Sequence, residues 1–222
     1  MTPADSASAT SANLADPTSA DPAEVVTFAD IDDPLLWVKP SARTDIAIVD
    51  HDAAWAGQYE ELAAAIRSLL GDRVLALQHI GSTSVPDLAA KPVIDIDLIV
   101  ADPRREDDYR PALAEVGYDL VIREPGWYEH RVFRHQDPDG TQRTPLSNLH
   151  VFGPHCPEFV RHRLFRDWLT VTPDDRRLYE DAKRRAAEES NDAGETTMDY
   201  NARKQSVIRD IYHRLFAASG LL

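Results

Sequence analysis

The sequence is poor in features that would mark several classes of protein. Its single cysteine, Cys156, excludes an intrachain disulfide and suits a reducing compartment. Its 24 Lys and Arg stand against 38 Asp and Glu, a formal net charge of -14. That charge argues against nucleic acid and anionic membranes as partners, because phosphate surfaces demand clusters of Lys and Arg. No apolar run approaches the roughly 20 residues of a membrane span, and the N-terminus lacks the basic start and apolar core of a signal peptide. We therefore expect a cytoplasmic protein that binds neither nucleic acid nor membrane.

The first 43 residues differ in composition from the rest of the chain. They are rich in Ala, Ser, Thr, Asp and Pro, with seven acidic residues against two basic ones. Such a segment cannot bury enough apolar surface to offset its ordering entropy, so we expect a disordered acidic tail over 1–43. Residues 44–222 are long enough for one domain, with a sheet core over about 45–155 and helices over about 156–219. One apolar patch in the tail either docks on that domain or binds a partner: Val25, Val26, Phe28, Ile31, Leu35, Leu36, Trp37 and Val38.

The central stretch, 79–100, carries the features most suggestive of chemistry. A tight turn over 81–84 precedes an apolar strand whose only charges are Asp95 and Asp97. Side chains alternate along a strand, so both carboxylates project from one face. A buried carboxylate without a partner costs several kcal/mol, so a buried pair needs a cation or donors. Two oxygen ligands beside a Gly-Ser turn suit Mg2+ and a phosphate.

Residues 79–96, HIGSTSVPDLAAKPVIDI, closely resemble the signature of the GrpB family, also called UPF0157. The usual family form is HIGSTSVPGLAAKPxIDI, so Asp87 stands where the family has Gly. The family is a branch of the DNA polymerase beta-like nucleotidyltransferases, whose pattern is Gly-Ser followed by Asp-x-Asp. The resemblance covers about 45–217. It implies an α+β fold, a nucleotidyltransferase-like mixed β-sheet with flanking helices and a C-terminal helical segment.

Hydrophobic periodicity predicts the elements around this stretch. An amphipathic helix is expected from Asp52, as its cap, to Gly71, and a charged helix over 104–116. A polar loop is expected over 188–195, within a helical C-terminal region. Strands are expected over 46–49, 74–79, 93–100, 118–122, 131–135 and 148–152.

The resemblance and the local chemistry together indicate a set of site residues. Asp95 and Asp97 are the candidate catalytic and metal-binding carboxylates. His150 occupies the position where the superfamily often has a third carboxylate; it is either a ligand or base, better suited to Mn2+ or Zn2+ than to Mg2+, or a buried structural histidine. The candidate phosphate and nucleotide contacts are Gly81, Ser82, Thr83, Ser84, Lys91, Arg131, Tyr179, Lys183, Tyr200 and Lys204. The two Tyr-Lys pairs have helical i, i+4 spacing, which places each pair on one helix face.

The leading functional hypothesis is transfer of a nucleotidyl group from an NTP, with Mg2+ or Mn2+, to an unknown acceptor, a small molecule or a protein. The second is a nucleotide-binding module without turnover, because His150 replaces a carboxylate. GrpB-like domains are fused to a coenzyme A-pathway kinase in some relatives, which fits an accessory role beside that pathway. The third is an interaction domain whose acidic tail recruits a basic partner. Metal-dependent NTP binding separates the first two from the third, and product formation separates the first from the second.

Overall fold

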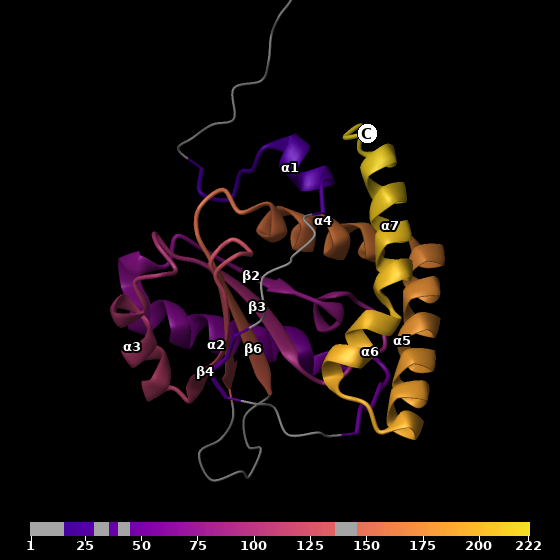
Figure 1. Cartoon of the computed structure of the whole chain (residues 1–222), viewed down its shortest axis with the longest axis horizontal. Coiled ribbons are helices and arrows are strands. Elements are labelled where there is room, and N and C mark those ends of the chain that lie inside the picture. The colour runs from indigo at the N-terminus through magenta and orange to yellow at the C-terminus, as the bar shows by residue number, and fades with distance from the viewer. Residues whose placement is uncertain (1–15, 29–35, 40–44, 136–145) are drawn as a thin grey trace, which may run out of the picture.

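The computed structural model describes residues 16–28, 36–39, 45–135 and 146–222. A six-stranded mixed sheet in the order β1-β4-β5-β6-β3-β2 forms its centre (Figure 1). β3 and β6 run parallel, and the other neighbouring strands are antiparallel. The strands are β1 (Leu36–Trp37), β2 (Ala76–Ile80), β3 (Ile94–Ile99), β4 (Tyr118–Glu124), β5 (His130–His135) and β6 (Ser147–Phe152).

One face of the sheet is covered by α2 (Ala54–Leu70) and α3 (Arg110–Glu115). The apolar stripe predicted for the first helix is buried here, with Trp55 and Ile66 packed in the same core as Ile94, Ile96 and Leu98 of β3. Because strand side chains alternate, the intervening Asp95 and Asp97 must face the other side of the sheet. The hydrophobic core on the α2 side therefore determines which face carries the polar residues.

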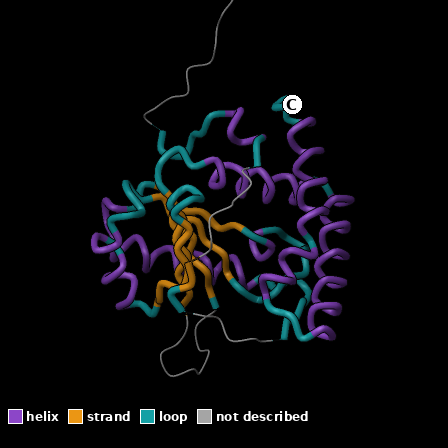
Figure 2. The backbone as a smooth tube through the Cα atoms, viewed as in Figure 1, coloured by secondary structure: helices purple, strands orange, loops and turns teal. Residues whose placement is uncertain are grey.

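The C-terminal helices lie on the polar side of the sheet, as the backbone trace shows (Figure 2). They are α4 (Pro157–Val171), α5 (Pro173–Ala193), α6 (Thr197–Arg203) and α7 (Gln205–Ala218). Proline at the first turn of α4 and of α5 starts each helix without losing a hydrogen bond. Gly194 ends α5 at φ +68°, and Thr196 with Asp199 forms a capping box that starts α6. The expected fold class, a mixed α+β sheet with flanking helices and a C-terminal helical segment, is confirmed.

The expected disordered tail is wrong for residues 16–28, which pack on α4 and α7. α1 (Pro22–Val26) buries Val25, and Phe28 lies edge-on to Tyr212 at 5.3 Å between ring centres. The guanidinium of the fully buried Arg161 donates from Nε to the carbonyl of Val25 at 2.8 Å and also reaches the carbonyls of Glu24 and Thr27. The segment is therefore ordered because it supplies carbonyl acceptors that a buried arginine requires. Of the two alternatives for the apolar patch, Val25, Val26 and Phe28 therefore follow the first, docking on the domain.

The second described part of the tail is β1, which pairs antiparallel with β4 at the sheet edge. Trp37 and Val38 are 39% and 40% exposed there. Ile31 and Leu35 lie outside the described residues. Within the described part of the chain, no helix is both long and apolar enough to cross a membrane.

Three local predictions are corrected by the structure. The expected strand 46–49 is reduced to a single bridge between Val49 and Ala90, because the Asn191 side chain pairs with both the N–H and the carbonyl of Ile46. The expected loop 188–195 is helical as far as Ala193, since this end of α5 buries Ser190. The expected helix 104–116 is a 3-10 turn followed by α3, which begins at Arg110 with proline in its first turn.

Candidate functional site

The strand register brings polar side chains from neighbouring strands together on the face opposite α2. Asp95 lies beside Asn148 of the parallel strand β6, and Asp97 lies beside His150. On the antiparallel neighbour β2, Gln78 pairs with Asp97. The prediction that the two aspartates share a face is confirmed by these contacts, and His150 lies on the same face as they do.

Asp97 is fully buried and already has two hydrogen-bond donors. His162 of α4 places Nδ1 3.0 Å from Oδ2 and 3.2 Å from Oδ1, and Gln78 donates to Oδ2 at 2.9 Å. Burial works to lower the pKa of His162, but the Asp97 carboxylate outweighs burial and raises that pKa to about 9. The pair is therefore a carboxylate beside an imidazolium at neutral pH, and the charge of Asp97 is compensated within the protein.

Asp95 is more open than Asp97 and touches the Gly-Ser turn directly. Its side chain is 29% exposed, and Oδ1 accepts a hydrogen bond from the Asn148 amide at 2.8 Å. Gly81 has φ +70°, and a Cβ at that position would stand 2.6 Å from Oδ2 of Asp95. Glycine is therefore required here both for the backbone angle and for the close approach of the carboxylate.

The hydroxyls of the turn do not all face the site. Thr83 is buried and donates to the Val93 carbonyl at 3.1 Å, while Ser84 donates back to the Gly81 carbonyl at 2.6 Å. These two side chains stabilise the turn, and the expectation that they contact phosphate does not match their placement. Ser82 instead shares a hydrogen bond with the hydroxyl of Tyr179 on α5; burial raises the pKa of Tyr179 to about 12, and this hydrogen bond opposes the rise.

Basic side chains surround Asp95 although the protein as a whole is strongly acidic. Lys91, Arg134 and Lys204 each interact electrostatically with the Asp95 carboxylate. Burial lowers the pKa of Lys204 to about 8 and also lowers that of Lys91, while Asp95 acts in the opposite direction on both. Lys204 also lies over the ring of Tyr200, 4.3 Å from its centre. Three basic side chains around one partly exposed carboxylate give this face a positive local potential, which favours an anionic ligand.

Lys183 lies deeper than the other cations. Its ammonium donates to the carbonyl of Ala89 and lies 4.7 Å from the centre of the Tyr179 ring. Burial lowers the pKa of Lys183 to about 7, and the charge of Lys204 acts in the same direction. Lys183 thus holds the segment that follows the Gly-Ser turn, and its nearness to Lys204 adds positive potential behind the site.

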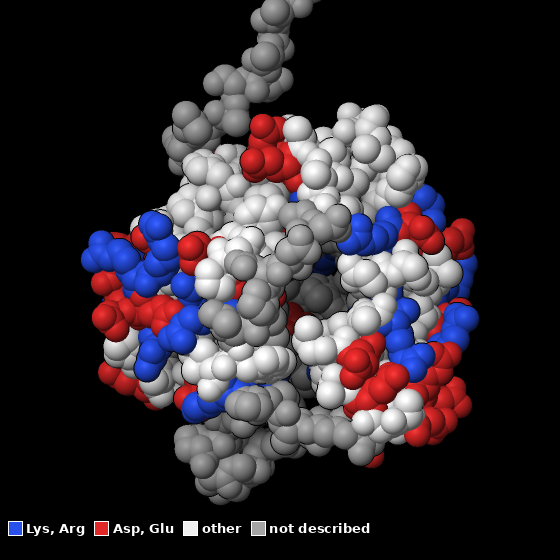
Figure 3. Space-filling model, viewed as in Figure 1, with Lys and Arg blue, Asp and Glu red and all other residues white. Residues whose placement is uncertain are grey.

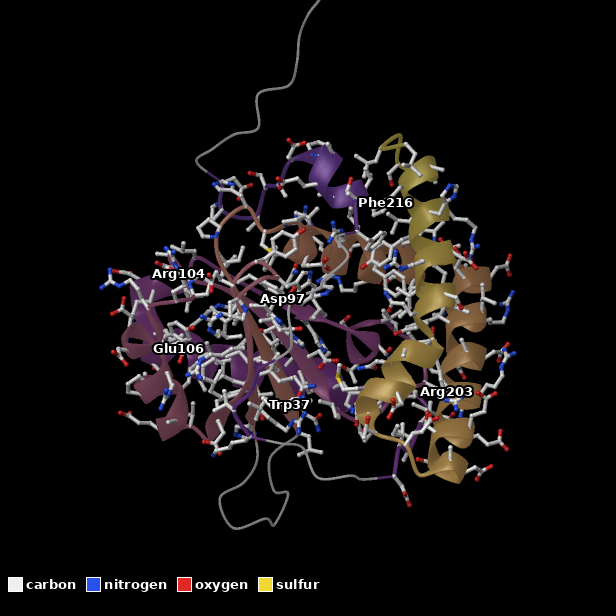
Figure 4. All side chains as sticks on the ribbon, in the orientation of Figure 1. Trp37, Asp97, Arg104, Glu106, Arg203 and Phe216 are labelled. Carbon is white, nitrogen blue, oxygen red and sulfur yellow. The ribbon has the colours of Figure 1, made fainter. Side chains whose placement is uncertain are left out.

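Arg131 does not belong to this site. Neighbouring positions on a strand face opposite sides of the sheet. Arg131 therefore points toward the α3 side, while His130 and Val132 face the side that carries Asp95. Its Nε donates to Oε1 of Glu106 at 2.8 Å, and the side chain is 6% exposed. Figure 4 places Glu106 at the α3 side of the molecule and Asp97 near its middle. The interpretation of Arg131 as a triphosphate contact is wrong, because its charge is used in a buried ion pair.

Several site residues were not identified from the sequence: Asn148, Arg134, His162, His130 and Glu124. Asn148 lies two positions before His150, so strand alternation was enough to find it. His162 lies in the segment RHRLFRDWL, where nothing distinguishes it from the neighbouring polar residues. Burial lowers the pKa of both His130 and His150, which leaves the two rings neutral.

The donor set favours a cation that arrives with its ligand over one held by the protein alone. Among the described residues, no group of three or more His, Cys, Asp or Glu side chains is arranged to hold a metal ion. Mg2+ bound with phosphates needs only one or two protein carboxylates. Asp95 fits that requirement, since it is the more exposed carboxylate and has cations and the Gly-Ser turn beside it. Both Asp97 oxygens already face His162, which makes Asp97 the poorer ligand of the two.

The surface over the site separates two strongly charged flanks. In Figure 3, Lys, Arg, Asp and Glu gather over the α3 side and over α5, and the described atoms that are visible between these flanks are mostly uncharged around a hollow.

Comparison with known proteins gives consistent matches over the domain. The family model described as GrpB protein matches residues 45–214. UPF0157 protein BH1888 of Halalkalibacterium halodurans is 41% identical over 172 residues, covering 78% of this chain and 83% of that protein. The crystal structure of conserved protein GrpB from Enterococcus faecalis matches with a TM-score of 0.64 at 28% identity, covering 78% of this chain and 99% of the other. A protein named dephospho-CoA kinase from Mycolicibacterium paratuberculosis is 28% identical over 203 residues, which span 81% of this chain and 48% of the kinase.

Proposed function

The chain belongs to the GrpB family, and on that premise we propose that it binds a nucleoside triphosphate with Mg2+ or Mn2+ and transfers the nucleotidyl group to an acceptor. The observation that carries the proposal is the concentration of Lys91, Arg134 and Lys204 around Asp95, beside the Gly81 turn, in a protein of net charge -14. Partly buried cations of this kind attract a multiply charged anion, because the low local dielectric strengthens each interaction.

Each residue of the site has a role in this reaction. Lys91, Arg134 and Lys204 neutralise the phosphates, and Ser82 adds a hydroxyl donor at the turn. Asp95 would hold the divalent cation, which would supply neutralisation of the negative charge of the phosphates. Asp97 and His162 form a buried pair behind Asp95 and fix the position of β3 against α4. Catalysis then depends on positioning and charge neutralisation.

A second function, nucleotide binding without turnover, is favoured by a different observation. The His162 imidazolium already compensates Asp97, and the third position carries His150 instead of a carboxylate. Such a domain would act as an accessory module, and the kinase-named relative suggests coenzyme A metabolism as its setting. Measurement of product formation distinguishes nucleotidyl transfer from nucleotide binding without turnover.

Calorimetric titration tests the proposal. Each of the four NTPs, with Mg2+ and with Mn2+, is titrated into the wild type, the Asp95→Asn variant and the Asp119→Asn variant. Asp119 is a matched control because it is a strand aspartate that is 64% exposed and pairs with Lys39 at the sheet edge. We expect metal-dependent binding by the wild type and by Asp119→Asn, and at least a tenfold loss in Asp95→Asn. A folded wild type that binds no NTP contradicts both functions and leaves the interaction-domain hypothesis.

Product formation is measured next. The wild type is incubated with the NTP that binds, labelled at the α-phosphate, and candidate acceptors. Transfer of the label, absent in Asp95→Asn, supports the enzyme. Binding without transfer across alcohol, amine and protein acceptors supports the accessory module.

A further inference from the structure

Three side chains from three strands form a continuous hydrogen-bonded line that ends at the site. Glu124, at the end of β4, places Oε2 2.6 Å from Nδ1 of His130 on β5. Nε2 of His130 lies 3.0 Å from Nδ1 of His150 on β6. Nε2 of His150 lies 4.0 Å from Oδ1 of Asp95 on β3. The two imidazole rings are nearly coplanar, at 3°, as an in-plane hydrogen bond requires.

The surroundings of His130 allow its ring one orientation. His130 is 2% exposed, its ring stacks on Phe152 with 4.5 Å between ring centres, and the ring of Trp127 lies perpendicular to it with 4.9 Å between ring centres. The turn that carries it places Tyr128 and Glu129 both at φ +54°. Two successive non-glycine residues in the left-handed region cost about 1–2 kcal/mol each. Backbone strain of this kind persists where the surrounding structure enforces it and is concentrated at functional sites.

The direction of the hydrogen bonds follows from the chemistry of the first group. Above the pKa of about 7 to which burial raises Glu124, this group is a carboxylate, which only accepts, so Nδ1 of His130 must carry a proton and donate to Glu124. In a neutral ring the other nitrogen then accepts, so Nε2 of His130 receives a hydrogen bond from Nδ1–H of His150. By the same reasoning, Nε2 of His150 has a free lone pair. Two acceptors, this nitrogen and Oδ1 of Asp95, therefore face each other across 4.0 Å.

We propose that Glu124 and His130 are positioning residues that hold His150 as its Nδ1–H tautomer, so that Nε2 accepts a hydrogen bond from the O–H or N–H nucleophile of the acceptor. This inference rests on the proposed nucleotidyl transfer and adds to it the atom that orients the nucleophile. Nitrogen and oxygen acceptors 4.0 Å apart leave room for one donor atom at hydrogen-bonding distance from both. The phosphates bind on the Lys91 and Lys204 side of Asp95.

Nitrogen NMR of the full chain with 15N-labelled histidine reads the tautomer directly. Spectra are recorded at pH 8.5, above the pKa of about 7 to which burial raises Glu124. For the wild type we expect His150 protonated at Nδ1 and unprotonated at Nε2. The opposite tautomer at His150 in the wild type overturns the inference.

Two variants break the line at different links, and a third is the control. Glu124→Met removes the acceptor, and His130→Phe keeps a ring between Trp127 and Phe152 but removes both nitrogens. In each we expect the His150 signals to move toward the Nε2–H form. Glu129→Gln alters a carboxylate in the same turn that contacts Arg131, and should keep the wild-type tautomer. Because the wild-type spectrum carries the first test, a variant that fails to fold does not remove it. A wild-type tautomer retained in both folded variants overturns the inference.

Kinetic measurement separates this inference from the proposed function. In Glu124→Met and His130→Phe we expect a 10–100-fold lower kcat, the range typical of residues that orient a functional histidine, with the KM for NTP unchanged. A raised KM for NTP with kcat unchanged overturns the positioning role while nucleotide binding stands. Absence of NTP binding in the wild type overturns the proposed function instead, whatever tautomer the spectrum shows, and the orienting role falls with it.

Discussion

His162 and Asp97 form a buried ion pair, with Nδ1 of the imidazole 3.0 Å from Oδ2 of the carboxylate. The carboxylate comes from the centre of the sheet and the imidazole from α4, so the pair joins the two layers of the domain. Removal of either partner from a buried ion pair leaves the other partner as an uncompensated buried charge. One carboxylate of the Asp-x-Asp motif thus has a structural role in this protein, apart from any metal.

We expect Asp97→Asn and Asp95→Asn to differ sharply in stability. Asp97→Asn removes the nearer of the two carboxylates beside His162, leaving Glu158 3.9 Å from Nε2, and should lower the free energy of unfolding by about 3 kcal/mol. Asp95→Asn affects a partly exposed side chain that keeps an acceptor for Asn148, and should cost less than about 1 kcal/mol. Urea unfolding at pH 7 measures both. Equal losses of unfolding free energy in the two variants would contradict the structural role of Asp97. The measurement also shows whether Asp97→Asn is stable enough to be used in binding experiments.

The Glu106–Arg131 pair gives a prediction about acid stability. The hydrogen bond from Arg123 lowers the pKa of Glu106 to about 2, with Arg131 adding to it and burial working against it. A depressed carboxyl pKa stabilises the fold above about pH 4.5, and this stabilisation is lost as the pH falls toward 2. Glu106→Gln should therefore be less stable than the wild type by up to about 3 kcal/mol at pH 7. The difference should narrow between pH 4.5 and 2, and a constant difference contradicts the assignment.

The variant Arg131→Met tests whether the arginine of the Glu106–Arg131 pair contributes to NTP binding. Because Arg131 points away from the Asp95 face, the variant should lose stability and retain metal-dependent NTP affinity within about twofold when folded. Calorimetric titration with the NTP that binds the wild type gives the answer. A tenfold or greater loss of affinity in a folded Arg131→Met protein would show that the arginine acts on the site after all.

Asp87 has a left-handed backbone, with φ +61°, at the position where the GrpB pattern has glycine. A residue with a Cβ is destabilised by about 1–2 kcal/mol in that conformation. Asp is destabilised less than Ala because its side chain can form a local hydrogen bond. Asp87→Gly should therefore leave stability nearly unchanged, whereas Asp87→Ala should be about 1 kcal/mol less stable than Asp87→Gly. Thermal and urea unfolding compare the three proteins. Equal stability of the Ala and Gly variants contradicts backbone strain at this position.

The docked segment 16–28 predicts that a residue outside the family match contributes to stability. Val25 is 3% exposed against α4 and α7, so Val25→Ala should cost about 1–2 kcal/mol. Glu24→Gln is the matched control, since the Glu24 side chain is exposed and its backbone carbonyl still reaches Arg161. Urea unfolding of the full chain measures both. No loss in Val25→Ala contradicts docking of this segment in solution.

Local sequence was enough to predict the core of the site. The close approach of Asp95 to Gly81 is seen only in the structure, but alternation placed Asp95 and Asp97 on one face, and a tight turn over 81–84 was predicted before the apolar strand. These predictions succeeded because each depends on residues a few positions apart along one strand or turn. The buried stripe of α2 was predictable for the same reason, since helical spacing fixes which side chains share a face.

Tertiary structure decided which groups meet the carboxylates. The line from Glu124 through His130 to His150 joins three strands, and His162 reaches Asp97 from a helix 65 positions away in the chain. Arg131 shows the limit most plainly, because it is one residue from His130 and faces the opposite side of the sheet. The sequence by itself determined the strands and the spacing of their polar residues. The register between strands, set by packing against α2 and α4, determined the partners, because contact across a sheet depends on long-range pairing that local spacing does not encode.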